Sequence, residues 1–211
     1  ASFDGDADRL IMVDEEGTVV NGDLILTLLA KYFSELNNLK NNIVVSTVMS
    51  NYGFKQAMQK FDFDLIETPV GDKYVAESMN KYDASLGGEQ SGHIIIADLL
   101  PVGDGLITLI MVLKALEHFG MTLCDFKNEN LYEYPQKLTN IELTNKLNDE
   151  EIEYINQIAL DMSIIKDLDG RYLIRNSGTE PLLRVLVEAK SAEAMQDFSD
   201  ELLTKINKYL N

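Results

Sequence analysis

The amino-acid sequence predicts an α/β protein in which a βαβ-type domain with a mixed sheet precedes a small α+β domain. Up to about residue 120, short apolar runs alternate with amphipathic stretches, which is typical of strands joined by helices. A polar stretch over residues 125–136 separates this pattern from a second one with a different rhythm. We therefore place domains over residues 23–127 and 128–211, with residues 1–22 as the tail of a preceding domain.

Apolar periodicity and capping residues define the elements of the first domain. Alternation of strands and helices favours substantially parallel strand pairing. Asp104 and Gly120 cap the last, strongly apolar helix, which we expect to be buried in the core. The predicted strands cover residues 10–13, 18–20, 43–45, 64–67 and 94–96, and the predicted helices cover residues 24–36, 51–60 and 106–119, with a further helix that opens at residues 68–73 and ends near residue 81.

The second domain is predicted from a capping box and a hairpin signal. Asn148 and Glu151 form the capping box of a helix that begins at the residue after Asn148. Strands are predicted on both sides of Asp169-Gly170. An extended stretch over residues 139–143 precedes them, and a final helix follows Ser191.

Composition and charge exclude several classes of function. A formal net charge of -17 argues against a broad surface for nucleic acids or anionic membranes, because phosphate groups would be repelled. Any anion must therefore be bound locally. The longest apolar run, residues 106–113, is too short to cross a bilayer, and the single cysteine, Cys124, fits a reducing compartment and a place in the core. We therefore expect a cytoplasmic protein.

Residues 4–9, Asp-Gly-Asp-Ala-Asp-Arg, predict a metal site. Asp4, Asp6 and Asp8 place carboxylates at alternate positions of a tight loop, where they repel one another unless a hard divalent cation such as Mg²⁺ or Ca²⁺ neutralises them. Arg9 adds a fixed positive charge beside them, which suits an anion shared between metal and guanidinium. We expect this anion to be a phosphate.

Two other interpretations of this loop stay open on the residues alone. Asp-Gly-rich hexapeptides also form solvated surface turns. The aspartates also match the first ligand positions of an EF-hand calcium loop, with Glu15 where the closing glutamate belongs. Against an EF-hand, Arg9 stands where the turn glycine is required, and the apolar run over residues 10–13 ends at a turn, as a strand does.

A glycine-rich loop that leads into the predicted strand 94–96, and a loop that follows the predicted strand 64–67, contain groups suited to sugar recognition. Residues 86–93 hold Glu89, Ser91 and His93 at alternate positions between glycines, so that these side chains project together. A carboxylate accepts from sugar hydroxyls, a serine donates or accepts, and an imidazole can move a proton. Asp72, in the loop after the preceding strand, either contacts the substrate or caps the next helix. An ordinary glycine-rich turn is the alternative for residues 86–93.

Residues 175–181, Arg-Asn-Ser-Gly-Thr-Glu-Pro, predict a phosphate site that needs no metal. An arginine, two hydroxyl groups and backbone N–H groups made accessible by glycine can surround a phosphate dianion. Pro181 ends the loop and stiffens it. As a turn between two strands, the same loop would need no ligand.

Taken together and in this order, these loops closely resemble those of the α-D-phosphohexomutases. The resemblance extends over nearly all of this chain, but it covers only about the C-terminal half of the family's four-domain architecture. It implies that the domains placed above are the third and fourth domains of the family. The segments that match the family are residues 4–9, 47–51, 70–72, 88–93 and 175–181.

The resemblance implies a phosphohexomutase reaction, and details of the sugar and phosphate loops point to the branch that acts on glucosamine phosphates. Glucosamine 6-phosphate would become glucosamine 1-phosphate through glucosamine 1,6-bisphosphate, with Mg²⁺ as the metal. Arg9 would steady the transferred phosphoryl group, and His93 would carry a proton near the reacting oxygen. The implied metal ligands are Asp4, Asp6 and Asp8, and the implied substrate-binding residues are Asp72, Glu89, Ser91, Arg175, Asn176, Ser177, Gly178 and Thr179.

Two departures from the family pattern matter. The phosphorylated serine of the family's first domain is absent from this sequence, so we expect this chain to be inactive alone and to need the missing N-terminal domains. Ala1-Ser2-Phe3, too short to form a strand that delivers the acidic loop, also points to an upstream segment. Lys73 stands where the family branch has arginine, which keeps the charge but not the forked geometry.

Several alternatives stay open at this stage. A calcium- or anion-binding module without chemistry would use the same loops. An aspartyl phosphatase with Asp4 as its nucleophile would need a hydrophobic strand before Asp4, which the sequence lacks. Glucose and mannose phosphates are alternative substrates, because few contacts distinguish a hydroxyl from an amine. A homodimer is compatible with the sequence.

Overall fold

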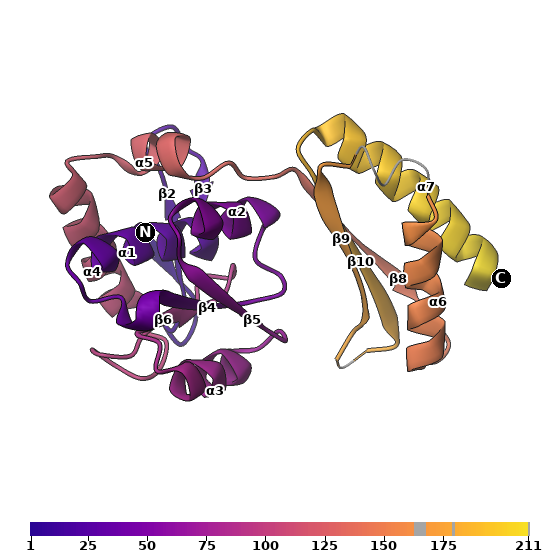
Figure 1. Cartoon of the computed structure of the whole chain (residues 1–211), viewed down its shortest axis with the longest axis horizontal. Helices are drawn as coiled ribbons and strands as arrows, with labels where there is room; N and C mark the ends of the chain where they lie inside the picture. The colour runs from indigo at the N-terminus through magenta and orange to yellow at the C-terminus, as the bar shows by residue number, and fades with distance from the viewer. Residues whose placement is uncertain (163–167, 179, 211) are drawn as a thin grey trace. The chain divides into compact units, whose positions relative to one another are not determined.

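The computed structural model describes residues 1–162, 168–178 and 180–210, and these form two compact units (Figure 1). Unit 1 comprises Ala1–Glu133, and unit 2 comprises Tyr134–Asn211. Each unit has its own cluster of buried apolar side chains. The predicted fold class, a mixed α/β sheet domain followed by an α+β domain, is confirmed.

Unit 1 is organised around a four-stranded mixed sheet with the order β5-β4-β6-β7. The central strand β4 pairs in parallel with β5 and β6, whereas β6 pairs with β7 in the antiparallel direction. The loops that leave β4, β5 and β6 therefore lie at one edge of the sheet, and β7 begins at that same edge. The strands are β4 (Ile43–Thr47), β5 (Asp64–Thr68), β6 (Leu86–Gly88) and β7 (Ile94–Ile96).

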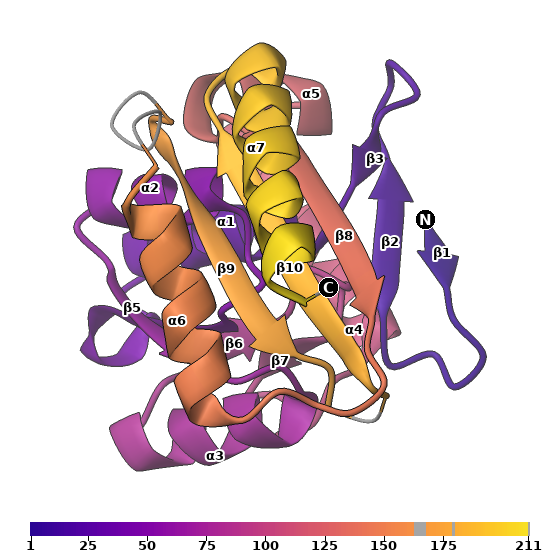
Figure 2. The same cartoon turned by 90° about the vertical axis from the view of Figure 1, so that its right-hand side faces the viewer.

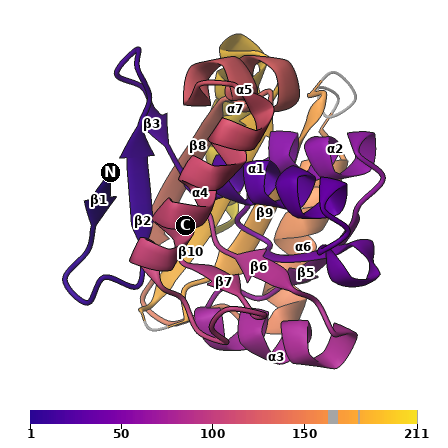
Figure 3. The ribbon, with the colours of Figure 1, turned by 90° about the vertical axis from the view of Figure 1, so that its left-hand side faces the viewer.

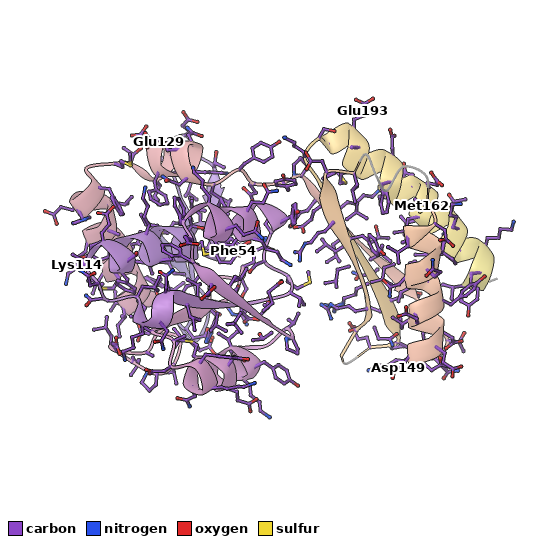
Figure 4. The ribbon with its side chains drawn as sticks, in the orientation of Figure 1. Phe54, Lys114, Glu129, Asp149, Met162 and Glu193 are labelled. Atoms are coloured by element: carbon purple, nitrogen blue, oxygen red, sulfur yellow. The ribbon has the colours of Figure 1, made fainter. Side chains whose placement is uncertain are left out.

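Side-chain caps start the helices of unit 1 other than α3. The Asn21 side chain accepts hydrogen bonds at the start of α1, Asn51 does so for α2, and Asp104 does so for α4. α1, α2, α4 and α5 bury their apolar faces in a core around Phe54, which lies inside unit 1 in Figure 4, whereas Val75 and Met79 of α3 pack in a second cluster with Val45 and Ile95. The helices are α1 (Gly22–Glu35), α2 (Tyr52–Lys60), α3 (Asp72–Tyr82), α4 (Gly105–Phe119) and α5 (Leu123–Asn130), with a 3-10 turn at Lys40–Asn42.

The expectation that α4 is buried in the core is wrong for one of its faces. Leu106, Ile110 and Leu113 follow one another at helical spacing and are 58%, 47% and 53% exposed. Only the opposite face, which includes Val112 and Ala115, packs in the core.

Within the described residues no single helix is long and apolar enough to cross a membrane, and α4 and α5 reach that length only together, across a 74° bend.

A small antiparallel sheet with the order β1-β2-β3 precedes α1. Its strands are β1 (Ser2–Phe3), β2 (Leu10–Val13) and β3 (Val19–Val20). Ser2 and Phe3, which we expected from the sequence to be too few for a strand, pair with Ile11 and Leu10 of β2. The acidic loop therefore joins two paired strands, and Figure 3 shows this sheet beside α4.

Unit 2 is a three-stranded antiparallel sheet with the order β8-β10-β9, and α6 and α7 cover one of its faces (Figure 2). The predicted capping box of Asn148 and Glu151 is present at the start of α6. The strand predicted before Asp169 would fall on residues 163–167, outside the described residues. The elements are β8 (Gln136–Glu142), α6 (Asp149–Leu160), β9 (Gly170–Asn176), β10 (Leu182–Ala189) and α7 (Ala192–Leu210).

The core of unit 1 predicts a sharp contrast between two substitutions. Phe54→Ala empties a fully buried site and should lower the free energy of unfolding of unit 1 by about 3–5 kcal/mol. Leu113→Ala, on the exposed face of α4, should change it by less than about 0.5 kcal/mol. Urea denaturation, monitored by hydrogen exchange of unit 1 amides, gives the free energy of unfolding of both variants. An equal loss of this free energy in the two variants would contradict this description of the core.

Candidate functional site

The acidic loop forms a cage of oxygen atoms. One carboxylate oxygen from each of Asp4, Asp6 and Asp8 lies within 4.8 Å of the others. Ala7 turns the chain with a φ of 60°, which brings the alternate aspartates to one side. Asp8 Oδ1 is buried and accepts no hydrogen bond from any residue that the structure describes. Three hard anionic donors this close, one with an unused buried oxygen, fit Mg²⁺ in their charge and chemistry.

Arg9 and His93 support the cage from two sides. The backbone N–H of Arg9 donates to Asp4 Oδ1 at 3.3 Å, and its Nε lies 3.6 Å from Asp4 Oδ2. His93 Nδ1 lies 2.9 Å from Asp8 Oδ2, and its ring is buried. A Cβ on Gly103 would lie 2.3 Å from His93 Nε2, so only glycine leaves room for this ring. The structure thus places the buried ring of His93 against Asp8, and its role as a proton carrier stays a prediction.

The EF-hand interpretation is not supported by the structure. Glu15, the residue in the position of the closing ligand, lies in the turn between β2 and β3. Its Oε1 accepts a hydrogen bond from the Cys124 N–H at 3.3 Å, and it does not belong to the group of Asp4, Asp6 and Asp8. A strand, not a helix, follows the loop.

Two backbone hydrogen bonds attach β2 and the first residue of α1 to the Gly88–His93 loop. The Leu10 N–H donates to the Gly92 carbonyl at 3.0 Å, and the Gly22 N–H donates to the Gln90 carbonyl at 2.9 Å. Arg9 and His93 form a β-bridge beside the first of these bonds. Unit 1 therefore brings together the predicted metal loop and the predicted sugar loop, which are about 80 residues apart in sequence.

Glu89 connects the loop after β5 to the loop after β6, at the same edge of the sheet. Its Oε1 accepts a hydrogen bond from the Gly71 N–H at 3.1 Å, so the loop after β5 touches the loop after β6. Asp72 and Ser91 lie in these two loops, and Ser91 is exposed. Asp72 is the first residue of α3, but Gly71 occupies the cap position, and the Asp72 carboxylate accepts a hydrogen bond from the Lys73 N–H next to it. The alternative that Asp72 is the helix cap is therefore wrong.

In unit 2, the loop that follows Arg175 joins β9 to β10. The pairing of these two strands places a second cationic residue, which sequence analysis missed, next to Arg175. Arg184 lies directly opposite Arg175 in the β9–β10 register. Burial, followed by the charge of Arg184, lowers the pKa of the Arg175 guanidinium, although an arginine stays protonated at neutral pH. The Glu180 carboxylate lies near one of these charges, with its Oε2 3.8 Å from Arg184 Nη2, and a bound anion would compensate the pair further. Pairing residues outward from the predicted turn over residues 177–181 could have identified Arg184 as the residue opposite Arg175.

Other groups of this loop have different environments. Ser177 is 2% exposed, and its Oγ has no hydrogen-bond partner in the described ranges, which suits an absent acceptor or donor such as a phosphate oxygen. Gly178 is exposed, and its carbonyl accepts from Lys146 Nζ at 2.6 Å. Thr179 lies outside the described residues.

The predicted phosphate contact of Asn176 stays a prediction, and the structure shows what its side chain binds within unit 2. Asn176 Nδ2 donates to the Leu147 carbonyl at 2.7 Å, and its Oδ1 accepts from the Leu147 N–H at 3.3 Å. Both ends of the amide thus bind the backbone of the segment before α6. Asn176 therefore holds that segment against the loop.

Comparison with protein-family models places this chain in a family. Residues 21–134 match the model of the phosphoglucomutase/phosphomannomutase alpha/beta/alpha domain III, and residues 138–205 match that of the phosphoglucomutase/phosphomannomutase C-terminal domain. The chain therefore belongs to the phosphoglucomutase/phosphomannomutase family, as the resemblance of its loops implied.

Relatives within this family narrow the comparison. The phosphoglucosamine mutase of Bacillus velezensis is 44% identical over 205 residues, which cover 97% of this chain and 45% of that protein. This chain therefore spans less than half the length of that relative.

Solved structures share the fold. The N-acetylphosphoglucosamine mutase of Aspergillus fumigatus, in complex with GlcNAc-6P and magnesium, superposes with a TM-score of 0.82 at 23% identity and covers 100% of this chain and 48% of its own. A serine-to-alanine variant of that enzyme in complex with glucose 1,6-bisphosphate gives a TM-score of 0.78 at 23% identity, covering 100% of this chain and 48% of its own.

The acidic cage predicts Mg²⁺ binding that depends on Asp6. Asp6→Asn removes one charged ligand and should weaken Mg²⁺ binding by about tenfold or more. Asp83→Asn is the matched control, because Asp83 is exposed beside Asn41 and has a φ of 49°, which asparagine also tolerates. Calorimetric titration of the folded chain with MgCl₂ gives the dissociation constants. Equal affinity in wild type and Asp6→Asn would show that the cage does not hold the ion.

The pair of arginines predicts a site for inorganic phosphate in unit 2. Arg184→Met keeps the aliphatic stem but removes one charge, so the affinity for phosphate should fall about tenfold or more. Lys190→Met removes a charge that is 67% exposed elsewhere in unit 2 and should leave this affinity unchanged. Phosphate titration, monitored through the Ser177 and Gly178 amide resonances, gives the affinity of both variants for phosphate. An equal loss of affinity in the two variants would indicate a general charge effect only.

Proposed function

We propose that this chain supplies the metal, sugar and phosphate sites of a phosphoglucosamine mutase, which interconverts glucosamine 6-phosphate and glucosamine 1-phosphate. The observation that carries the proposal is the hydrogen bond between Asp8 and His93, because it joins the acidic loop directly to the Gly88–His93 loop. A transferred phosphoryl group must meet a sugar hydroxyl, so the groups that recognise them have to be held together. The 44% identity to a phosphoglucosamine mutase supports glucosamine as the sugar.

The acidic loop acts at the reacting end of the substrate. Asp4, Asp6 and Asp8 hold Mg²⁺, which when bound would neutralise charge on the transferred phosphoryl oxygens. Arg9 steadies the same phosphoryl group from the neighbouring position. His93 keeps the Asp8 carboxylate in place, an orienting role that agrees with its buried ring better than proton transfer does.

The loops after β5 and β6 recognise the sugar. Glu89 accepts hydrogen bonds from ring hydroxyls through the oxygen that Gly71 does not use. The exposed hydroxyl of Ser91 and the carboxylate of Asp72 offer further contacts at the same edge of the sheet. These groups position the hydroxyl that receives the phosphoryl group.

Unit 2 supplies a phosphate site without a metal. Arg175 and Arg184 give the charge, Ser177 gives a hydroxyl, and Gly178 leaves its backbone accessible. Thr179 joins this set through the family resemblance. A mutase needs one site that transfers a phosphoryl group and another that only holds a phosphate, so that glucosamine 1,6-bisphosphate can use either end in turn.

The reaction also needs a phosphoryl carrier. We assign it to a serine in the part of such an enzyme that this chain does not cover, since the matched relative is more than twice as long as the matched region. This chain alone should therefore show no mutase turnover.

A fusion protein tests the proposal. The part of the Bacillus velezensis enzyme that precedes its matched region is joined to this chain, and conversion of glucosamine 6-phosphate is measured with Mg²⁺. We expect turnover by the fusion, none by the chain alone, and a loss of about a hundredfold or more in kcat for the fusion with Asp6→Asn.

Three outcomes would contradict the proposal in different ways. A folded but inactive fusion would argue against the assigned sites, and turnover by the chain alone would mean that the phosphoryl carrier is misplaced. A higher kcat/KM with mannose 6-phosphate or glucose 6-phosphate would keep the mutase chemistry but change the substrate.

A further inference from the structure

Asp23 is a buried carboxylate to which the proposed mechanism gives no role. It lies in the first turn of α1, where Asn21 is the capping residue, and it is 1% exposed. The positive end of a helix favours a carboxylate, but a charge buried this deeply also needs direct hydrogen-bond donors. The location of those donors in the fold indicates the structural role of Asp23.

The donors come from two loops at the candidate site. Asp23 Oδ2 accepts from the backbone N–H of Asn51 at 2.7 Å and from Gln90 Nε2 at 3.1 Å. Asn51 ends the loop after β4, and Gln90 lies in the loop after β6. One carboxylate oxygen therefore connects α1 to loops that are about 40 residues apart in sequence.

Close packing of the backbone reinforces this connection. The Gly22 N–H donates to the Gln90 carbonyl at 2.9 Å, and a Cβ on Gly22 would lie 1.9 Å from the Glu89 carbonyl oxygen. The Glu89-Gln90 segment is thus held against the first turn of α1 through both backbone and side chain. Glu89 in turn binds the Gly71 N–H, so the loop after β5 depends on the same anchor.

We infer that Asp23 is a positioning residue for sugar recognition, which fixes the Gln90 side chain and the Asn51 backbone and thereby aims the Glu89 carboxylate. The inference rests on the proposed function, because it assigns the aimed group to a sugar hydroxyl. Asp23 touches no substrate. Without its oxygen, the Asn51 N–H and the Gln90 amide lose this acceptor, and the loops after β4 and β6 lose one of the hydrogen bonds that connect them through α1.

The experiment uses the full 211-residue chain and three variants. Asp23→Ala removes the acceptor. Asp23→Asn keeps one amide oxygen, which can still accept from both donors, so it should restore most of the effect. Asp14→Ala is the matched control, because Asp14 is also buried in unit 1 and its Oδ1 also accepts two hydrogen bonds, from the Glu16 and Thr18 N–H groups at 3.0 and 2.7 Å.

Three measurements separate positioning from general stability. The dissociation constant for glucosamine 6-phosphate, followed through unit 1 amides, should rise about tenfold or more in Asp23→Ala and stay near wild type in Asp23→Asn and Asp14→Ala. Hydrogen exchange of the Asn51 and Gly71 amides should accelerate by a similar factor only in Asp23→Ala. The affinity of unit 2 for inorganic phosphate should be the same in all four proteins.

Unchanged exchange and unchanged sugar-phosphate affinity in Asp23→Ala would overturn the inference, as would equal losses in Asp23→Ala and Asp14→Ala. If wild type binds no glucosamine 6-phosphate, the proposed function fails instead, and the Asn51 and Gly71 amides alone decide whether Asp23 holds these loops.

Discussion

The parallel pairing of β4 with β5 and β6 is the constraint on which unit 1 depends. Parallel strands direct their carboxyl ends to one edge of a sheet, so three loops that are distant in sequence must gather there. Fully buried apolar residues in β4 and β6, such as Val44, Val45 and Leu86, hold this arrangement. Since β7 returns antiparallel from the same edge, His93 arrives where Asp8 can bind it.

The distribution of charge gives the second constraint. In a chain with a formal charge of -17, three carboxylates lie together in unit 1, and two guanidinium groups lie opposite each other in unit 2. Gathering like charges lowers stability unless an ion of opposite charge is bound. A bound cation would compensate the three carboxylates, whereas Glu180, 3.8 Å from Arg184, already compensates part of the charge of the arginine pair, and a bound anion would add to it.

The buried polar groups of the candidate site belong to one connected set. His93 orients Asp8, Glu89 holds Gly71, and Asp23 holds Gln90 and Asn51. In unit 2, Asn176 has a comparable supporting place against Leu147. Groups that contact a substrate need neighbours that restrict their movement, because a small displacement weakens both binding and catalysis.

The elements that the sequence predicted well are those governed by neighbouring residues. The capping box at Asn148, the cap at Asp104 with Gly120 at the other end, and the apolar strands depend on spacing within a few residues. The loops with unusual chemistry were also visible, because carboxylates at alternate positions or an arginine before glycine stand out locally. Relations that depend on strand pairing or on burial were not predicted: the pairing of Ser2 with Ile11, the exposed face of α4, and the place of Arg184 opposite Arg175, which the hairpin register could have indicated.

The amino-acid sequence therefore showed which chemical groups are available for binding and catalysis. The folded structure alone showed which of these groups lie in contact with one another. An aspartate can be recognised as a ligand from its neighbours, but its partner depends on strand pairing and burial across the chain. The roles of His93, Asn176 and Asp23 followed only from such pairing, since each side chain is satisfied by a residue far away in sequence. Hydrogen bonds of this kind are decided by the packing of the whole unit, which no short stretch of residues contains.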